Sequence, residues 1–151
     1  MNATPLRYRN DTADAGGIER HLRACDHLFH PPLSTRVDLA TYAGKLAASA
    51  QRSEAWDGDM LAGLVAGYLN AEAAEIYISN VSVLESHAGR GIASNLLLRT
   101  LEQARARGCS RARLEVSAEA ISALRLYQKL GFAPDPDSVG NDDRRILTKT
   151  I

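Results

Sequence analysis

Residues 76–98 read IYISNVSVLESHAGRGIASNLLL, and this stretch decides the fold. The β-branched, partly alternating run over 76–83 predicts a strand. The apolar spacing that begins at Ile92 predicts an amphipathic helix. Between them lies Gly89-Arg90-Gly91, so the stretch predicts a strand, a glycine-rich turn and a helix in that order.

The turn and the start of the helix have the chemistry of an anion cradle. Glycine lets the backbone approach a ligand closely, and the first turn of a helix carries N–H groups without intrahelical partners. These donors and the helix dipole favour a phosphate or pyrophosphate. The alternative, weighted equally on this stretch alone, is that the glycines only turn the chain. A dinucleotide fingerprint is less favoured, because Ser94 stands where a third glycine is needed. The predicted cradle comprises Gly89, Arg90, Gly91, Ile92, Ala93 and Ser94.

Length and composition favour a single domain over residues 1–151. A chain of 151 residues with 45% hydrophobic content can bury a substantial core. Its 18 basic and 18 acidic residues balance, which argues against a non-specific nucleic-acid or membrane binder. Without a long apolar run or a leader-like segment, we expect a cytoplasmic protein. Cys25 and Cys109 form no C-x-x-C pair and are expected to be structural thiols, and no closed set of metal ligands emerges.

The order of predicted elements indicates a mixed α/β sheet with helices on both faces. Because a helix separates the strands 76–84 and 111–117, they are expected to run parallel through a right-handed crossover. The sequence Asp57-Gly58-Asp59 favours a tight hairpin turn. The other predicted elements are strands at 6–9, 53–56, 60–69, 132–133 and 145–151, helices at 18–29, 39–50, 92–107 and 119–130, a cap at 10–12 and a loop over 134–143.

The segment 29–36, FHPPLSTR, is a stiff and partly apolar loop between two predicted helices. It combines a cation with a titratable imidazole, so it could hold a small-molecule acceptor. The alternative, rated equal, is that its prolines only end one helix before Asp38 caps the next. Glu75 and Tyr77, where the central strand begins, could also touch an acceptor. The predicted acceptor-binding residues are Phe29, Pro32, Leu33, Arg36 and Tyr77.

Two motifs in this order resemble those of the GNAT N-acetyltransferase superfamily. The segment 88–93, AGRGIA, is similar to the family's phosphate loop, Q/R-x-x-G-x-G/A. The segment 120–132, AISALRLYQKLGF, is similar to N-x-x-A-x-x-L-Y-x-K-x-G-F. Ala88 and Ala120 depart from the pattern, and the loss of the usual asparagine at 120 predicts weaker cofactor binding than is typical.

The resemblance implies a mostly antiparallel sheet whose central parallel pair of strands is splayed for acetyl-CoA. It implies acetyl transfer to a primary amine of a small molecule or peptide, by direct attack in a ternary complex. Val81, Ser82 and Val83 would pair with the pantetheine arm, and their backbone N–H groups would polarise the thioester carbonyl. Relatives often pair as homodimers. The alternatives are a non-catalytic CoA-binding or regulatory module, and a transferase that uses a hydroxyl acceptor or a longer acyl group.

The same resemblance assigns catalytic roles to two residues. Tyr127 would donate a proton to the departing thiolate, and a phenol with a pKa of about 10 suits a thiol with a pKa of about 8.5. The alternative for Tyr127 is a side chain packed near the cofactor whose hydroxyl only binds water. Glu115 would be the general base that deprotonates the amine. The alternative for Glu115 is a carboxylate paired with a nearby arginine. His87 is expected at the surface or in contact with phosphate rather than as a base.

Overall fold

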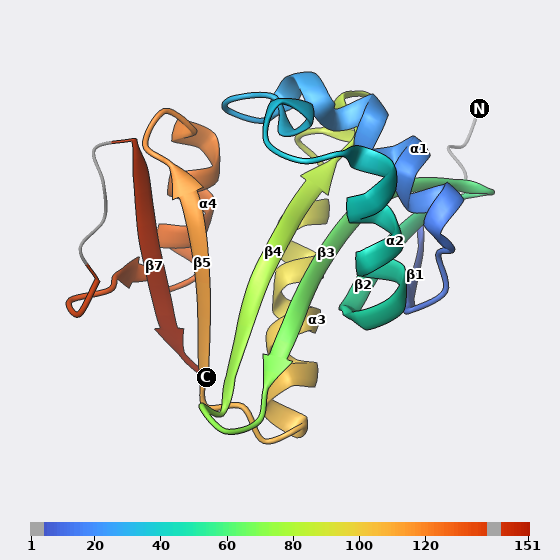
Figure 1. The fold of residues 1–151 in the computed structure, drawn as a ribbon. Coiled ribbons are helices and arrows are strands. Elements are labelled where there is room, and N and C mark those ends of the chain that lie inside the picture. The colour runs from blue at the N-terminus through green and yellow to red at the C-terminus, as the bar shows by residue number, and fades with distance from the viewer. Residues whose placement is uncertain (1–4, 139–142) are drawn as a thin grey trace.

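The computed structural model describes residues 5–138 and 143–151, which build one mixed sheet (Figure 1). Its strand order is β1-β2-β3-β4-β5-β7-β6, and only the β4–β5 pair is parallel among the described strands. The predicted fold class is confirmed. The strands are β1 Arg7–Asn10, β2 Gln51–Asp57, β3 Met60–Asn70, β4 Glu75–Val83, β5 Arg111–Ser117, β6 Ala133–Pro134 and β7 Arg144–Thr150. The helices are α1 Ala15–Cys25, α2 Leu39–Ser49, α3 Ile92–Ala106 and α4 Ile121–Lys129, with 3-10 turns at Asp26–Leu28, Leu33–Thr35 and Glu85–His87.

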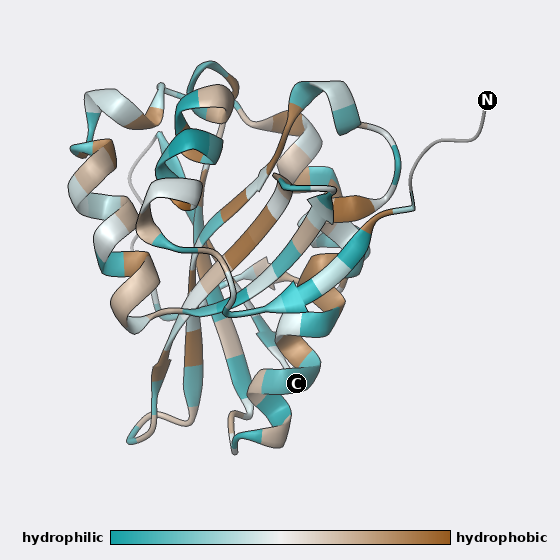
Figure 2. Cartoon of the chain, turned by 90° about the vertical axis from the view of Figure 1, so that its right-hand side faces the viewer, coloured by the Kyte–Doolittle hydropathy of each residue, from teal (hydrophilic) through white to brown (hydrophobic). Residues whose placement is uncertain are grey.

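The helices cover the sheet on both faces. Apolar residues of α1 and α2 pack on one side of β3, and those of α3 pack on the other side, against β4 and β5. Hydrophobic segments follow the central strands between these layers (Figure 2). Neither α1 nor α2 reaches β5 and β7. The face of these two strands on the α1–α2 side of the sheet is therefore left uncovered by the helices described (Figure 1).

A β-bulge in β4 reverses which residues face which helices. Ala66 lies opposite Asn80 and Gly67 lies opposite Ile78, so Ser79 is the extra residue. Before the bulge, Ile78 faces the α3 core. After the bulge, Asn80 and Ser82 lie opposite Ala66 and Leu64, which belong to the α1–α2 core. The bulge therefore places an amide and a hydroxyl on the α1–α2 side.

The parallel strands β4 and β5 separate part of the way along. They pair only between Glu75–Ile78 and Arg111–Leu114. Beyond these residues the strands diverge, and a gap widens toward the carboxyl end of both (Figure 1). This is the splayed pair that the sequence predicts.

A buried carboxylate ties the N-terminal segment to the sheet. The side chain of Glu54 is fully buried, and it accepts hydrogen bonds from the N–H groups of Thr12 at 3.1 Å and Ala13 at 3.0 Å. It also pairs with Arg52 at 3.4 Å and accepts a hydrogen bond from the indole of Trp56 at 3.2 Å. Because one carboxylate serves so many donors, this part of the fold depends on it.

Several predicted boundaries are wrong at the helix ends. Asp14 caps α1 by accepting a hydrogen bond from Gly17 N–H at 2.7 Å, whereas the predicted cap residue Asp11 accepts from Arg52 N–H. The first helix ends at Cys25 and continues only as a 3-10 turn. The last helix begins at Ile121 instead of 119. Residues 139–142 of the predicted loop over 134–143 lie outside the described residues.

Candidate active site

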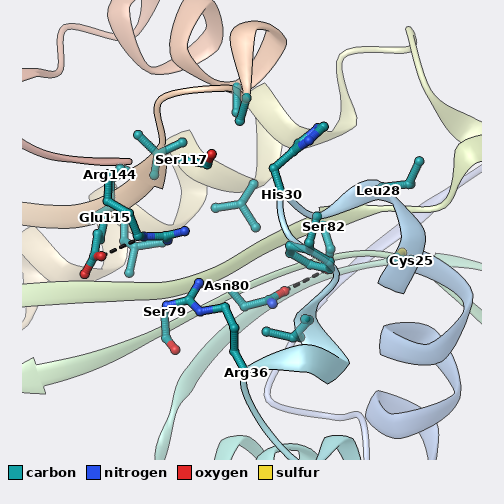
Figure 3. A pocket seen from close by; sticks show the side chains of 18 of the residues that line it. Cys25, Leu28, His30, Arg36, Ser79, Asn80, Ser82, Glu115, Ser117 and Arg144 are labelled. Carbon is teal, nitrogen blue, oxygen red and sulfur yellow. Dashed lines mark hydrogen bonds and ion pairs between the residues drawn. The ribbon is translucent and has the colours of Figure 1, made fainter. Parts of the chain in front are cut away.

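A cavity of about 220 Å³ occupies the gap between β4 and β5 (Figure 3). It is lined by the carboxyl ends of both strands, by the start of α4 and by the loop that joins α1 to α2. These elements meet here because the strands separate and leave a hollow that the α1–α2 loop and α4 cover. Of the predicted site residues, those that line this cavity are Phe29, Leu33, Arg36, Val81, Ser82, Val83, Glu115 and Tyr127.

The other predicted site residues lie outside this cavity. Pro32 and Tyr77 do not line it, although both neighbour residues that do. Ala93 lines an adjoining hollow together with Val83 and Tyr127. The remaining members of the predicted cradle, Gly89, Arg90, Gly91, Ile92 and Ser94, line neither. They form the turn and first residues of α3 beside it.

The α1–α2 loop is held against the cavity by a side-chain clasp. Asp26 accepts hydrogen bonds from Ser34 N–H at 2.7 Å and from Ser34 Oγ at 2.6 Å. These bonds from Ser34 lower the pKa of the Asp26 carboxyl. The loop contains a cis His30–Pro31 bond. The clasp presents the side chains of Phe29, Leu33 and Arg36 to the cavity.

The glycine turn before α3 has the geometry of an anion cradle. Gly89 and Gly91 have φ values of +78° and +74°, which glycine adopts without strain. Gly91 is the N-cap and gives no side-chain hydrogen bond to the helix. The first intrahelical bond joins Asn95 N–H to Gly91 O at 3.0 Å. The N–H groups of residues 92–94 are therefore available to a ligand.

His87 anchors the start of this turn. Its Nε2 lies 2.8 Å from Asp57 Oδ2, and its Nδ1 lies 2.8 Å from Ser86 Oγ. The side chain is buried, so the expectation of a surface residue is wrong, while the expected phosphate contact stays a prediction. His87 instead fixes the glycine turn to the β2–β3 hairpin.

The side chain of Tyr127 is buried between α4 and the cavity. Its ring meets that of Phe132 edge to face, with centroids 5.9 Å apart. Burial raises the pKa of the hydroxyl to about 12, so the phenol keeps its proton at neutral pH. No described residue forms a hydrogen bond with this hydroxyl, which leaves it free to act on a ligand in the cavity.

Glu115 is paired with an arginine at the mouth of the cavity. Arg144 Nε donates a hydrogen bond to Glu115 Oε1 at 2.6 Å (Figure 3). This is the pairing that the sequence leaves open as the alternative to a base. The carboxylate still lines the cavity, so the contact orients Glu115 without removing it from the site.

The two cysteines lie in different parts of the fold but share the same protonation state. Cys25 lines the cavity and Cys109 lies at the far end of α3, and both thiols are free and buried. Burial raises the pKa of Cys25 to about 12 and also raises that of Cys109. Both therefore remain protonated thiols at neutral pH, as expected of structural cysteines.

Tyr42 on α2 holds the β4 bulge, and the sequence analysis missed it. Its hydroxyl lies 2.6 Å from Ser79 Oγ and donates to Ser79 O at 3.2 Å. Burial raises the pKa of this phenol to about 12. The only hint in the sequence is that Ser79 and Asn80 interrupt a β-branched run.

A buried polar chain begins at the cavity and ends at α1. Ser82 Oγ lies 2.7 Å from Asn80 Oδ1 and 2.9 Å from His21 Nε2, while His21 Nδ1 lies 2.8 Å from Leu61 O. A carbonyl only accepts, so Nδ1 carries the proton of the neutral ring. Desolvation lowers the pKa of His21. The sequence analysis missed His21 because it shares the apolar face of α1 with Leu22 and Cys25.

This histidine makes the stability of the fold depend on pH. Its folded-state pKa lies below the unfolded value, so the unfolded chain binds more protons as the pH falls below about 6.5. We expect the free energy of unfolding to fall there by up to about 1.4 kcal/mol per pH unit on account of His21. Urea titrations between pH 7.5 and 5.5 measure the slope. His21→Gln should flatten it, whereas His27→Gln, at an exposed position, should not. Equal slopes in all three proteins would contradict the assignment.

Comparison with known proteins defines the class to which this fold and site belong. The model of the acetyltransferase (GNAT) family matches residues 18–132, which cover both motifs and the cavity walls from α1 to α4. The chain belongs to this family. The family and its cofactor, acetyl-CoA, are those that the two motifs predict.

The individual relatives match shorter segments of the chain than the family model does. The chain is 39% identical over 56 residues to N-alpha-acetyltransferase MAK3 of Arabidopsis thaliana, which covers 37% of this chain and 30% of that protein. It is 35% identical over 78 residues to the uncharacterized N-acetyltransferase YvbK of Bacillus subtilis, 52% of this chain and 50% of the relative. The matches thus span at most half the length of these curated relatives.

Solved structures share the whole fold. The ribosomal-protein-S18-alanine N-acetyltransferase of Escherichia coli superposes with a TM-score of 0.78 at 20% identity, covering 97% of this chain and 94% of that one. The PaiA N-acetyltransferase of Thermoplasma acidophilum, in complex with coenzyme A, gives 0.74 at 12% identity, covering 97% and 99%. No helix within the described residues is long and apolar enough to cross a bilayer.

Proposed function

We propose that this chain is an acetyl-CoA-dependent N-acetyltransferase whose acceptor is a primary amine of a small molecule or peptide. The observation that carries the proposal is the gap between β4 and β5. It places the free backbone of β4 and the hydroxyl of Tyr127 around one cavity, and the glycine turn before α3 lies beside that cavity. Family relatives named for N-acetylation, MAK3 among them, support an amine acceptor.

The chain offers a continuous site for the cofactor. The N–H groups of residues 92–94, with the turn over 89–91, would hold the pyrophosphate. The edge of β4 at Val81, Ser82 and Val83 has no partner strand on the β5 side, so its backbone can pair with the amide groups of the pantetheine arm. This placement directs the thioester toward Tyr127.

Acetyl-CoA supplies the activated acetyl group, and the side chains of this site manage the protons. A lysine-like amine with a pKa of about 10.4 holds its proton at neutral pH, and an α-amine with a pKa near 8 does so partly. Glu115 accepts this proton. Backbone N–H groups of residues 81–83 stabilise charge on the thioester oxygen. As the nitrogen–carbon bond forms and the carbon–sulfur bond breaks, Tyr127 donates its hydroxyl proton to the leaving sulfur, and the second proton that the nitrogen loses returns to the phenolate of Tyr127.

Two measurements test this function together. Isothermal titration should show acetyl-CoA binding at submillimolar concentration, and CoA at 100 times its Kd should add about 2.7 kcal/mol to the free energy of unfolding. A screen of amine acceptors that monitors free thiol release should then find turnover. Absence of both binding and thiol release would overturn the proposal.

Replacing the proposed base should produce a pH-dependent loss. We expect Glu115→Gln to lower kcat about 100-fold at pH 7 and to recover as the pH approaches the pKa of the amine. The reason is that an already neutral amine needs no base. Rates measured between pH 6.5 and 10 check this.

Arg144→Gln is the matched control, because it breaks the same ion pair and keeps the carboxylate. It should retain most of the activity of the unmodified enzyme at pH 7. If both variants lose equal activity with the same pH profile, the ion pair matters and Glu115 is not the base.

A further inference from the structure

The uncovered face of β5 carries charged side chains next to the cavity mouth. Ala112 and Leu114 pack into the α3 core, so alternation directs Arg113 and Glu115 to the opposite face. Tyr77 lies directly beside Arg113 on the neighbouring parallel strand. Helices α1 and α2 stop short of these strands and do not cover this face (Figure 1).

Two further arginines reach the same place from other elements. Arg36 extends from the α1–α2 loop toward the Glu115–Arg144 pair at the mouth of the cavity (Figure 3). The electrostatic neighbours of the Tyr77 hydroxyl show the same convergence. Burial and then Glu115 raise the pKa of this hydroxyl, while Arg144, Arg113 and Arg36 act to lower it. Three guanidinium groups and one carboxylate therefore lie close enough to the Tyr77 hydroxyl to act on it electrostatically.

The positive charges in this cluster are not all neutralised. Arg144 uses Glu115 as its partner. The side chains of Arg36 and Arg113 have no hydrogen-bonding or ion-pair partner among the described residues. The Nε of Arg113 is shielded from solvent and unpaired, which is costly for a charged donor. An anion bound here would satisfy this donor.

We propose that the acceptor carries a carboxylate as well as its amine, and that Arg113 and Arg36 bind this carboxylate beside Tyr77. This inference depends on the proposed acetyltransferase function. A guanidinium group presents paired N–H donors that match a carboxylate, so the chemistry of the cluster fits. The arginines are specificity-determining residues and take no part in the transfer itself.

The geometry of the strand sets the separation between the two groups of the acceptor. Arg113 lies two residues before Glu115, about 6.6 Å along β5. An acceptor whose amine lies at Glu115 can therefore place its carboxylate at Arg113 only if several bonds separate the two groups. The acidic side chain at the second position of a peptide meets this requirement, and so does the α-carboxylate of an amino acid with a side-chain amine.

Matched acceptor pairs test the inference. The peptide amides Ala-Glu-Ala-Ala and Ala-Gln-Ala-Ala differ only in the carboxylate, and so do lysine and lysinamide among small amines. We expect kcat/KM to be at least about tenfold higher for the acid of at least one pair. The pair that responds identifies the source of the carboxylate. Equal rates within both pairs would overturn the inference.

Variants link the preference to the arginines. Arg36→Gln and Arg113→Gln should each reduce the acid-over-amide ratio toward one, whereas Arg9→Gln, on the exposed edge strand β1, should keep it. If Arg113→Gln fails to fold, Arg113→Lys replaces it in the test. This variant keeps the positive charge and should retain a part of the acid-over-amide ratio. A full ratio in both Arg36→Gln and Arg113→Lys would contradict the assignment.

A binding measurement separates failure of this inference from failure of the proposed function. Calorimetric titration of each acid and amide into the protein with CoA reports the preference without turnover. If the protein binds acids selectively but releases no thiol with any acceptor, the proposed function is overturned and the carboxylate site is supported. Thiol release from other amines, without acid-selective binding or rates, would overturn the inference alone. Failure of all acids to bind or react would also overturn it.

Discussion

Tyr127→Phe should lower kcat about 100- to 1,000-fold and leave the KM for acetyl-CoA nearly unchanged. The variant removes one oxygen and keeps the ring, so the edge-to-face contact with Phe132 is preserved. The loss falls on the step in which the thiolate departs, because the phenol is the proposed proton donor to the leaving sulfur. Steady-state kinetics with thiol detection measure the effect.

Tyr8→Phe is the matched control for this change. Tyr8 lies on β1, where its ring contacts the guanidinium of Arg99 far from the cavity, and its variant should behave as the unmodified enzyme. If Tyr127→Phe matches the unmodified enzyme in every transfer assay, the non-catalytic CoA-binding module becomes the better description. The thermal midpoint of Tyr127→Phe should equal that of the unmodified enzyme, which would exclude misfolding as the cause of a lower rate.

Glu54→Ala should lower the free energy of unfolding by about 3 to 5 kcal/mol. Glu54 is fully buried, and its removal leaves the buried guanidinium of Arg52 without a counter-charge. It also leaves the N–H groups of Thr12 and Ala13 without their acceptor. Urea denaturation measures the loss, and the thermal midpoint should fall by roughly 6 to 20 °C.

Glu102→Ala, on the exposed side of α3, serves as the control and should change stability by less than about 0.5 kcal/mol. A small effect for Glu54→Ala would mean that the local structure relaxes and supplies water to Arg52. In that case the N-terminal segment does not depend on this carboxylate.

Periodicity predicts the elements of this fold well because each depends on its own residues. The alternation over 111–117 gives β5 its bounds, and the apolar spacing after Ile92 gives α3. The parallel pairing of β4 and β5 follows from their order along the chain. Of the residues that the two motifs mark, Tyr127 lines the cavity and the glycine turn lies beside it, although their roles there remain predictions.

Contacts between residues far apart in the chain could not be predicted in this way. Glu54 binds a backbone segment about forty residues earlier, and nothing near it in the sequence marks it as buried. His21 faces the core at apolar spacing, and only Leu61 and Ser82 reveal why a histidine is there. Likewise, no spacing rule predicts that Arg36, from the α1–α2 loop, lines the same cavity as Glu115 and Arg144.

The extra residue at position 79 determines which side chains of β4 face α1 and α2 and which face α3. Without this bulge, Ser79 would take a regular place in the two-residue alternation along β4. Asn80 and Ser82 would then turn away from α1, and two valines would take their place. The bulge thus determines which face of β4 carries the side chains that can form hydrogen bonds.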